Sequence, residues 1–199
     1  VVGFMNGGPV RKLIINPGVK SANDPALYIY FLNEESGMIE IRRIKPDERT
    51  AAKRVVYRVA HAIFNDPRPL EESIAYHESR NELKDMNDIQ KSYFDNGGIF
   101  LVMTENDQLI CTGAIRQLED GICELKRLWL LTEYHGQGLG YRMLQECLSF
   151  AREKGYKRIR LETDPVAQSR ALEFYKKLGF YEIPSYTDRG DEVALEMVL

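Results

Sequence analysis

The chain has 199 residues, of which 44% are hydrophobic and 29% are charged. These fractions are typical of a folded globular protein, and the length suits one sizeable core rather than two full-sized enzyme domains. The 27 Lys and Arg residues against 30 Asp and Glu residues give a formal net charge of −3. This balance provides no overall attraction for nucleic acid or for an anionic membrane, so we expect neither as a partner.

Cysteine and histidine spacings exclude several kinds of site. The three cysteines form no CxxC pair, which excludes zinc ribbons and thioredoxin-type redox sites, and their odd number argues against a disulfide scaffold. The three histidines lack HExxH or other ligand spacing, so we predict no metal. No apolar run reaches the ~18 residues of a membrane-spanning helix, and the first residues do not follow the pattern of a secretory signal. We therefore expect a cytoplasmic protein.

The first 36 residues differ in composition from the rest. They are rich in Gly, Pro and Asn, and two short apolar runs at residues 13–15 and 27–32 interrupt them. This pattern predicts an N-terminal extension, residues 1–36, that carries up to two short strands and packs onto a main domain of residues 37–199.

From residue 38 the side chains follow regular periods. Residues 38–44 alternate as in a strand, and Pro46 precedes a helix whose apolar positions recur every three to four residues as far as Ile63. A more polar helical stretch is predicted over residues 70–94, with a break near 85–87. Strands are predicted over 99–104, 108–117 and 122–131, and the tight turns between them indicate an antiparallel meander.

The second half predicts helices and strands in alternation. Residues 138–154 carry a helical apolar stripe, residues 158–163 form a strand, and Asp164-Pro165 offers the start of a helix that ends at Gly179. A last strand is predicted over 193–199. The long helical connection between strands 122–131 and 158–163 requires parallel pairing. The predicted fold class is therefore α/β (mixed α+β), with a mixed, mostly antiparallel sheet flanked by helices.

The most informative stretch joins a predicted strand to a predicted helix and reads His135-Gly136-Gln137-Gly138-Leu139-Gly140-Tyr141. Its three glycines remove Cβ atoms where a backbone must approach a ligand. The helix start offers unpaired N–H groups and the positive end of the helix dipole. Together these features predict a cradle for a phosphate or a diphosphate. The alternative is a flexible strand–helix turn that binds no ligand, in which glycine is present only for steric reasons.

Two other phosphate-binding motifs fit less well. A P-loop needs Gly-Lys-Ser/Thr after four free positions, and the chain has no such run. A dinucleotide fingerprint read from Gly138 has Met143 in place of its third glycine, although Glu162 stands about 20 residues on, where a ribose contact is expected. Too few residues follow Glu162 to complete a doubly wound domain.

Two blocks carry a family resemblance. Residues 128–140, LWLLTEYHGQGLG, resemble the acyl-CoA signature of the GNAT N-acetyltransferase superfamily, Arg/Gln-x-x-Gly-x-Gly/Ala. Residues 171–180, ALEFYKKLGF, resemble the later helix segment of that family, A-x-x-F-Y-x-K-x-G-F. The blocks occur in family order, and the resemblance covers residues 38–199. His135 replaces the usual Arg or Gln and Gln168 replaces a frequent Asn, but both side chains can still donate hydrogen bonds.

The resemblance implies a GNAT-like acyl-CoA N-acyltransferase fold whose parallel strand pair splays at the cofactor site. It also implies acetyl-CoA as co-substrate and no metal. Backbone N–H groups of the glycine turn would hold the diphosphate, and main-chain groups of two strand leucines would bind the pantetheine arm as an added strand does. The expected cofactor-binding residues are Leu128, Leu130, His135, Gly136, Gln137, Gly138, Leu139, Gly140, Tyr141, Gln168 and Tyr175.

Acetyl transfer to an amine needs a neutral nucleophile, a stabilised carbonyl oxygen and a proton for the departing thiolate. Tyr175 matches the family tyrosine that serves as general acid, and the alternative is a core aromatic residue. Glu124, near the start of the strand that leads to the glycine turn, is the candidate base, and the alternative is a solvated strand residue. The N–H of Leu128 or Leu130 is the candidate oxyanion donor.

We therefore expect an N-acetyltransferase that moves the acetyl group of acetyl-CoA to a primary amine of a small molecule or amino acid by direct attack. The alternatives are a protein or peptide N-acetyltransferase, a non-catalytic acyl-CoA-binding regulatory module and a nucleotide-dependent oxidoreductase. Acceptor specificity would come from the helices between residues 46 and 94 and from residues 181–191. Dimers are common in such families, so a homodimer is compatible with this prediction.

Other features of the sequence are expected to be structural. His61 and His77 stand on predicted helices, as surface or core residues, and Trp129 is expected to pack within a strand. The basic residues of 42–45 and 49–54 are expected on a solvated face. The cysteines stand in apolar contexts, which does not favour a nucleophilic role.

Overall fold

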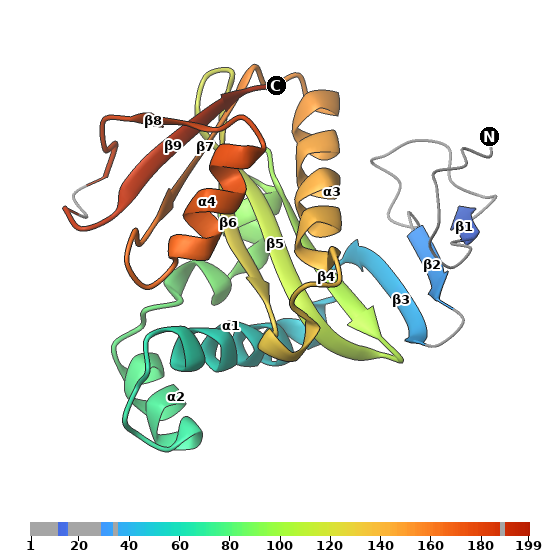
Figure 1. Cartoon of the computed structure of the whole chain (residues 1–199), viewed down its shortest axis with the longest axis vertical. Helices are drawn as coiled ribbons and strands as arrows, with labels where there is room; N and C mark the ends of the chain where they lie inside the picture. The colour runs from blue at the N-terminus through green and yellow to red at the C-terminus, as the bar shows by residue number, and fades with distance from the viewer. Residues whose placement is uncertain (1–11, 16–28, 34–35, 188–189) are drawn as a thin grey trace.

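The computed structural model describes residues 12–15, 29–33, 36–187 and 190–199. Within this part of the chain nine strands form one sheet, in the order β1-β2-β3-β4-β5-β6-β7-β9-β8 (Figure 1). The strands are β1 (Lys12–Ile15), β2 (Ile29–Asn33), β3 (Ser36–Arg43), β4 (Ile99–Glu105), β5 (Gln108–Glu119), β6 (Ile122–Leu130), β7 (Arg158–Thr163), β8 (Tyr181–Ile183) and β9 (Val193–Val198). The helices are α1 (Arg49–Ile63), α2 (Leu70–Ser79), α3 (Leu139–Glu153) and α4 (Ser169–Lys177), and the short helical segments are η1 (Pro46–Glu48), η2 (Lys84–Met86), η3 (Gln90–Phe94) and η4 (Thr132–Tyr134).

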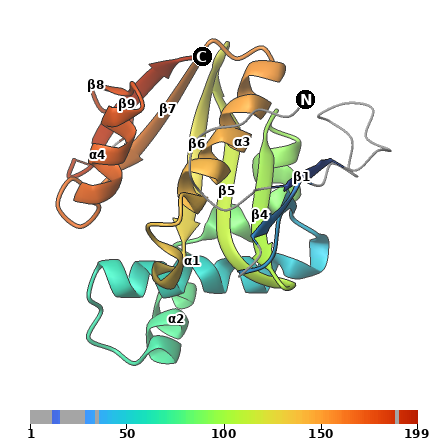
Figure 2. The same cartoon turned by 45° about the vertical axis from the view of Figure 1, so that its right-hand side comes forward.

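Helices cover both faces of the sheet, as the alternation of side chains along the strands requires. A Cβ added at Gly113 of β5 would meet Met143 and Cys147 of α3, so this face of β5 carries α3. The next residue, Ala114, points the other way and belongs to a buried cluster with Ala52 and Val56 of α1. Figures 1 and 2 show the same arrangement, with α3 and α4 on one side of the sheet and α1 with α2 on the other.

The order and direction of the central strands confirm the predicted mixed sheet. β4, β5 and β6 form an antiparallel meander, and β7 pairs antiparallel with β9. β6 and β7 form the parallel pair that the helical crossover through α3 requires. Their pairing covers only residues 122–124 of β6 and 158–160 of β7, so the two strands separate beyond Glu124. This separation is the splay that the family resemblance implies.

The two short strands predicted for the first 36 residues are present as β1 and β2. β2 pairs antiparallel with β3, and β1 pairs antiparallel with β2, so both strands continue the sheet of the main domain. The division of the chain at residue 36 stays a prediction. Among the described residues no helix combines the length and the apolar character needed to cross a membrane.

Several element boundaries differ from the predicted ones. The polar stretch 70–94 is not one helix with a break near 85–87, because α2 already ends at Ser79 and Asn81 adopts a left-handed conformation with φ 56°. Asp164 does not begin α4; its carboxylate accepts hydrogen bonds from the N–H groups of Val166 and Ala167, both at 2.8 Å, in a turn that precedes the helix. The short edge strand β8 carries too few residues to show a period, and the sequence did not predict it.

The basic segment at residues 42–45 is not a solvated face throughout. Arg42 is 5% exposed, and it donates hydrogen bonds to both carboxylate oxygens of Glu48 at 2.6 and 2.7 Å. A buried guanidinium requires such a bidentate partner, and Glu48 supplies it from η1 because Pro46 begins that turn. The prediction failed here because the partner becomes a neighbour only when β3 meets η1.

Candidate functional site

The glycine turn has the geometry that a phosphate cradle requires. Gly136 and Gly138 adopt φ angles of 79° and 75°, a left-handed conformation that L side chains rarely adopt, and Gly138 is the N-cap of α3. A Cβ added at either position would meet no atom within 4 Å, so the space in front of these residues is open. The first N–H groups of α3 have no partner within the helix and face this exposed turn. These features fit the diphosphate of an acyl-CoA.

The side chain of His135 contacts the strand that precedes the turn. Its Nε2 lies 3.0 Å from the carbonyl oxygen of Leu130, and the backbone N–H of His135 donates to the carbonyl of Thr132. The ring is thereby tied to the end of β6, next to the cradle. Its predicted contact with a cofactor stays a prediction, as does that of the half-exposed Tyr141.

The main chain of β6 offers hydrogen-bonding groups on the side from which β7 has departed. Leu131 donates its N–H to the carbonyl of Ile110 in β5. Because successive residues of a strand direct their main-chain groups to opposite sides, Leu130 and Leu128 direct theirs toward the gap beside β7. These are the two leucines that the resemblance assigns to the pantetheine arm, and their geometry fits that role.

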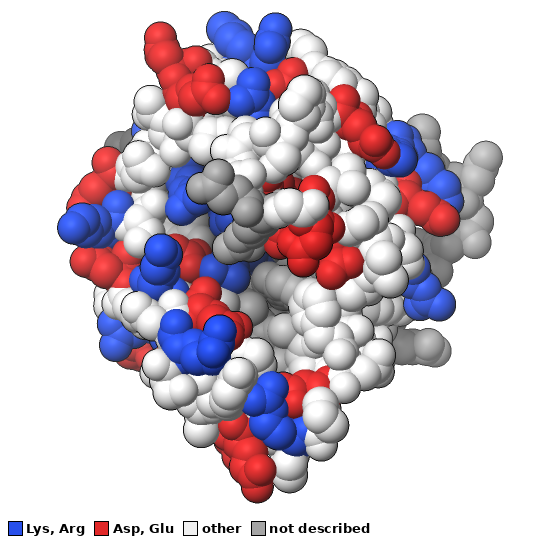
Figure 3. Space-filling view, turned by 90° about the vertical axis from the view of Figure 1, so that its left-hand side faces the viewer, with Lys and Arg blue, Asp and Glu red and all other residues white. Residues whose placement is uncertain are grey.

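A cavity of about 980 Å³ lies where β6 and β7 separate. Residues 125–129 of β6 and 161–163 of β7 line it, together with Ala171 and Tyr175 of α4 on one side and Tyr57, His61 and His77 of α1 and α2 on the other. Because α4 and α1 cover opposite faces, the cavity passes through the plane of the sheet. Figure 3 shows this side of the molecule hollowed near its centre, with a cluster of acidic side chains on one flank and a mixture of basic and acidic side chains on the other.

Tyr175 projects from α4 into the buried core beside this cavity. It is 7% exposed, and its ring packs against the ring of Phe180 at 5.5 Å between centroids. Burial raises the pKa of its hydroxyl above the ordinary value of 10.0, and the neighbouring thiols of Cys147 and Cys111 add to the shift. The phenol therefore keeps its proton at neutral pH, as a proton donor must.

Gln168 lies on the cavity wall at the N-cap of α4. Its Oε1 accepts hydrogen bonds from Oγ1 of Thr163 at 2.9 Å and from the N–H of Asp164 at 3.1 Å. These bonds hold the side chain against the end of β7. The amide nitrogen of Gln168 would be the hydrogen-bond donor to a cofactor.

Glu124 is buried rather than solvated. It is 1% exposed, and its carboxylate accepts hydrogen bonds from Arg116 at 2.7 Å and from the hydroxyl of Tyr186 at 3.2 Å, with Nζ of Lys126 at 3.5 Å. It stands at the last paired position of β6 and β7, one residue before the part of β6 that lines the cavity. Its role as a base stays a prediction.

Glu162 is a carboxylate of this site that the sequence reasoning considered only for a ribose contact. It lines the cavity from β7, and it accepts hydrogen bonds from the hydroxyls of Thr187, at 2.8 and 3.0 Å, and Ser185, at 3.2 Å. The parallel pairing of β6 and β7 could have indicated it, because Glu162 follows Arg160, the partner of Glu124, on the same face of the sheet.

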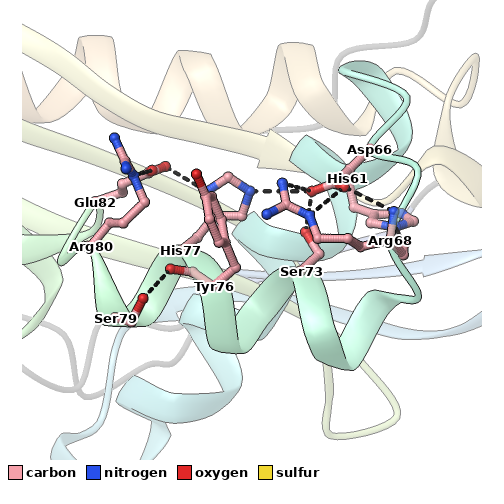
Figure 4. A network of polar contacts seen from close by, with 9 residues as sticks. All are labelled: His61, Asp66, Arg68, Ser73, Tyr76, His77, Ser79, Arg80 and Glu82. Carbon is pink, nitrogen blue, oxygen red and sulfur yellow. Dashed lines mark hydrogen bonds and ion pairs between the residues drawn. The ribbon is translucent and has the colours of Figure 1, made fainter.

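A polar network forms the wall on the side of α1 and α2 (Figure 4). Asp66 accepts hydrogen bonds from Nε and NH2 of Arg68 at 2.8 Å and from the hydroxyl of Ser73 at 2.6 Å, and these bonds hold the pKa of Asp66 far below its ordinary value. The ring of His77 lies between two carboxylates, with Nε2 at 3.3 Å from Asp66 and Nδ1 at 2.7 Å from Glu82. His61 and His77 thus belong to the cavity wall, which their helical positions alone did not indicate.

Comparison with known proteins agrees with this geometry. Residues 59–180 match the model of the acetyltransferase (GNAT) family, which is more than half of the chain. The chain belongs to the GNAT acetyltransferase family. N-acetyltransferase 8B of Homo sapiens is 33% identical over 102 residues, which cover 48% of this chain and 44% of that protein. The uncharacterized N-acetyltransferase YjgM of Escherichia coli is 30% identical over 101 residues, which cover 49% of this chain and 60% of that protein.

Solved structures share the fold at lower identity. The PaiA N-acetyltransferase of Thermoplasma acidophilum, solved in complex with coenzyme A, has a TM-score of 0.66 at 23% identity, with 81% of this chain and 99% of that chain covered. A GNAT-family acetyltransferase of Staphylococcus aureus has a TM-score of 0.69 at 19% identity, with the same coverage. These matches confirm the predicted fold class. The chain spans about half the length of the curated relatives that it matches.

Proposed function

We propose that this chain transfers the acetyl group of acetyl-CoA to a primary amine of a small molecule or amino acid. The observation that carries the proposal is the cavity between the separated strands β6 and β7, because the same strand β6 leads directly into the glycine-spaced start of α3. The proposed phosphate cradle at the start of α3 and the unpaired edge of β6 are therefore adjacent. This edge of β6 borders the cavity, which reaches both faces of the sheet. The proposed catalytic unit is residues 37–199, with residues 1–36 as an extension.

In the proposed binding mode, the start of α3 and the edge of β6 bind different parts of acetyl-CoA. The N–H groups of Gln137 to Tyr141 bind the diphosphate at the start of α3. The main-chain groups of Leu128 and Leu130 bind the pantetheine arm along the gap left by β7. His135 lies beside the glycine turn, near the proposed diphosphate site, and Gln168 lies in the cavity wall, near the proposed site of the thioester. Acetyl-CoA, when bound, supplies an activated acetyl group as a thioester.

The proposed chemistry is direct attack of the amine on the thioester carbonyl. An amine has a pKa near 10 in water, so a base must accept its proton, and we assign this role to Glu124, through water. Glu162 is the second candidate base, because its side chain lines the cavity. The N–H of Leu128 donates a hydrogen bond to the carbonyl oxygen as negative charge develops there. Tyr175 donates its proton to the departing thiolate, which the raised pKa of its hydroxyl permits.

The acceptor amine enters from the side of α1 and α2. Arg68, Arg80 and Lys84 line the cavity near these helices, and the carboxylates of Glu162, Asp164, Asp191 and Glu192 line it from β7 and from the segments that follow β7 and precede β9. The acidic part of this lining attracts a substrate that arrives as an ammonium ion. The volume of about 980 Å³ must also hold the acyl end of the cofactor, which favours a small acceptor over a folded protein. Acetylation of a peptide N-terminus is the second candidate.

A screen for thiol release tests the proposal. The wild-type chain is mixed with acetyl-CoA and a panel of amines, amino acids and short peptides, and free CoA is measured with a thiol reagent. We expect release above the rate without acceptor for at least one amine, with the acetylated amine found by mass spectrometry. Binding of CoA without release for any acceptor would instead support a non-catalytic acyl-CoA-binding module.

A further inference from the structure

Strand β6 contains a strained residue at the point where it borders the cavity. Arg127 adopts φ 54°, a left-handed conformation that is uncommon for any residue with a side chain. The pairing of β5 with β6 passes from Thr112 with Trp129 to Ala114 with Lys126, so Arg127 and Leu128 together oppose Gly113. This is a β-bulge, in which one residue is left out of the regular ladder. A conformation of this kind persists only where the surrounding structure imposes it.

The side chain of Arg127 is held by a segment far away in the sequence. Its Nε donates to Oδ2 of Asp85 at 2.9 Å, and its NH2 donates to Oδ1 of the same carboxylate. The hydroxyl of Tyr93 donates to Asp85 as well. Burial alone would raise the pKa of Asp85, but the hydrogen bonds and charge of Arg127 outweigh it and lower the pKa to about 2. The pair is therefore ionised throughout the neutral range.

The main chain of the same residue is held from the opposite side. The hydroxyl of Thr112, in β5, donates to the carbonyl oxygen of Arg127 at 2.7 Å. Thr112 is fully buried, and the side chains of Arg127 and Asp85 are 15% and 11% exposed. The bulge is thus fixed at its side chain by Asp85 and Tyr93 and at its carbonyl by Thr112.

We propose that Asp85, Tyr93, Thr112 and Arg127 are positioning residues, which hold the β6 bulge so that the N–H of Leu128 points at the thioester carbonyl. We call these four residues the bulge clamp. The peptide bond that joins Arg127 to Leu128 contains both the carbonyl bound by Thr112 and the N–H of Leu128, so fixing one end of this planar unit fixes the other. An oxyanion donor is effective only when its direction is set before the reaction. This role rests on the proposed function.

The clamp also connects the two substrate sides of the cavity. Asp85 belongs to η2, and its neighbours Leu83 and Lys84 line the cavity on the acceptor side. Arg127 and Leu128 line it on the cofactor strand. The ion pair between Asp85 and Arg127 therefore sets the position of the acceptor wall relative to the oxyanion donor.

The test uses Thr112→Val, which has nearly the same shape but lacks the hydroxyl, with Thr112→Ser as the conservative variant that keeps it. Tyr156→Phe is the matched control, because the hydroxyl of Tyr156 donates to the carbonyl of Gly97 at 3.0 Å, away from the cavity. For each variant we would measure kcat and KM for acetyl-CoA with the acceptor found in the thiol-release screen. Amide hydrogen exchange over residues 125–130 reports separately on the bulge, and Tyr93→Phe serves as a second, milder variant.

We expect Thr112→Val to lower kcat about tenfold. This loss is smaller than that from removing an oxyanion donor, because the N–H of Leu128 is still present but less well directed. The KM for acetyl-CoA should change less than about threefold. Exchange within residues 125–130 should accelerate, while Thr112→Ser and Tyr156→Phe keep the wild-type values. An unchanged kcat in Thr112→Val and Tyr93→Phe, or an equal loss in Tyr156→Phe, would overturn the proposal. Absence of thiol release in the wild type would overturn the proposed function, and the exchange measurement would then decide separately whether Thr112 holds the bulge.

Discussion

Replacement of Gly138 by alanine separates the cost of backbone strain from the loss of a ligand cradle. Gly138 has φ 75° at the start of α3, and Gly155 has φ 84° just after the end of the same helix. A Cβ at either position meets no atom within 4 Å, so neither substitution creates a clash within the protein. Gly138→Ala and Gly155→Ala therefore impose similar strain, but only the first changes the proposed diphosphate site.

The expected magnitudes follow from this geometry. Placing an L residue in the left-handed region lowers the free energy of unfolding by about 1–2 kcal/mol. The lower conformational entropy of the unfolded alanine variant offsets about 0.4–1 kcal/mol of this loss. A net loss of about 1 kcal/mol lowers the melting temperature by about 2–4 °C for a chain of this size, in both variants. If Gly138→Ala also weakens one N–H bond to a charged phosphate, worth about 1.5–3 kcal/mol, the Kd for CoA rises about ten- to hundredfold.

Titration calorimetry with coenzyme A and thermal unfolding of the two variants provide the assay. We expect equal losses of melting temperature and a weakened affinity for CoA in Gly138→Ala only. A wild-type Kd in Gly138→Ala, or the same increase of Kd in Gly155→Ala, would refute the assignment of the diphosphate to this turn.

Three further outcomes follow from the site. Tyr175→Phe should lower kcat by about 10²-fold or more while the Kd for CoA changes little, and an unchanged kcat would remove Tyr175 from the chemistry. Glu124→Gln should lower kcat by about 10²-fold or more, whereas Glu162→Gln should change it little; the reverse result would assign the base to Glu162. The raised folded-state pKa of Tyr175 means that its contribution to stability is complete below pH ~10 and is lost as the pH rises further. Between about pH 10 and 12 the wild type should therefore lose more free energy of unfolding than Tyr175→Phe, and equal losses would contradict the shift.

Elements with a strong local signal were predictable from the sequence. The strand at 158–163 and the helix over most of 138–154 agree with β7 and α3, because alternation and a helical stripe are properties of neighbouring residues. The glycine turn was also recognisable, because Gly136 and Gly138 adopt the left-handed angles for which glycine is the usual residue. The parallel pair β6 and β7 followed from the length of the connection between them.

Features that depend on distant contacts were not predictable. Asp85 and Arg127 are 42 positions apart, and nothing local to either residue indicates that they form a buried pair. His61 and His77 follow helical spacing, but the packing of α1 against α2 decides that they face the cavity. α2 ends early because Asn81 turns the chain in a left-handed conformation that a polar helical pattern does not reveal. The local patterns thus predicted the glycine turn, whereas the part of the cavity wall formed by α1 and α2 required the structure.

In the proposed complex, strand β6 and the glycine turn that follows it bind an acyl-CoA, with the thioester at the gap between β6 and β7. Amide hydrogen exchange of the wild-type chain, with and without saturating coenzyme A, tests it directly. We expect slower exchange in two places together, at residues 137–141 and at Leu128 and Leu130, with little change in the exposed helix α2. Saturation with CoA that leaves both places unprotected, or that protects a different surface, would contradict it.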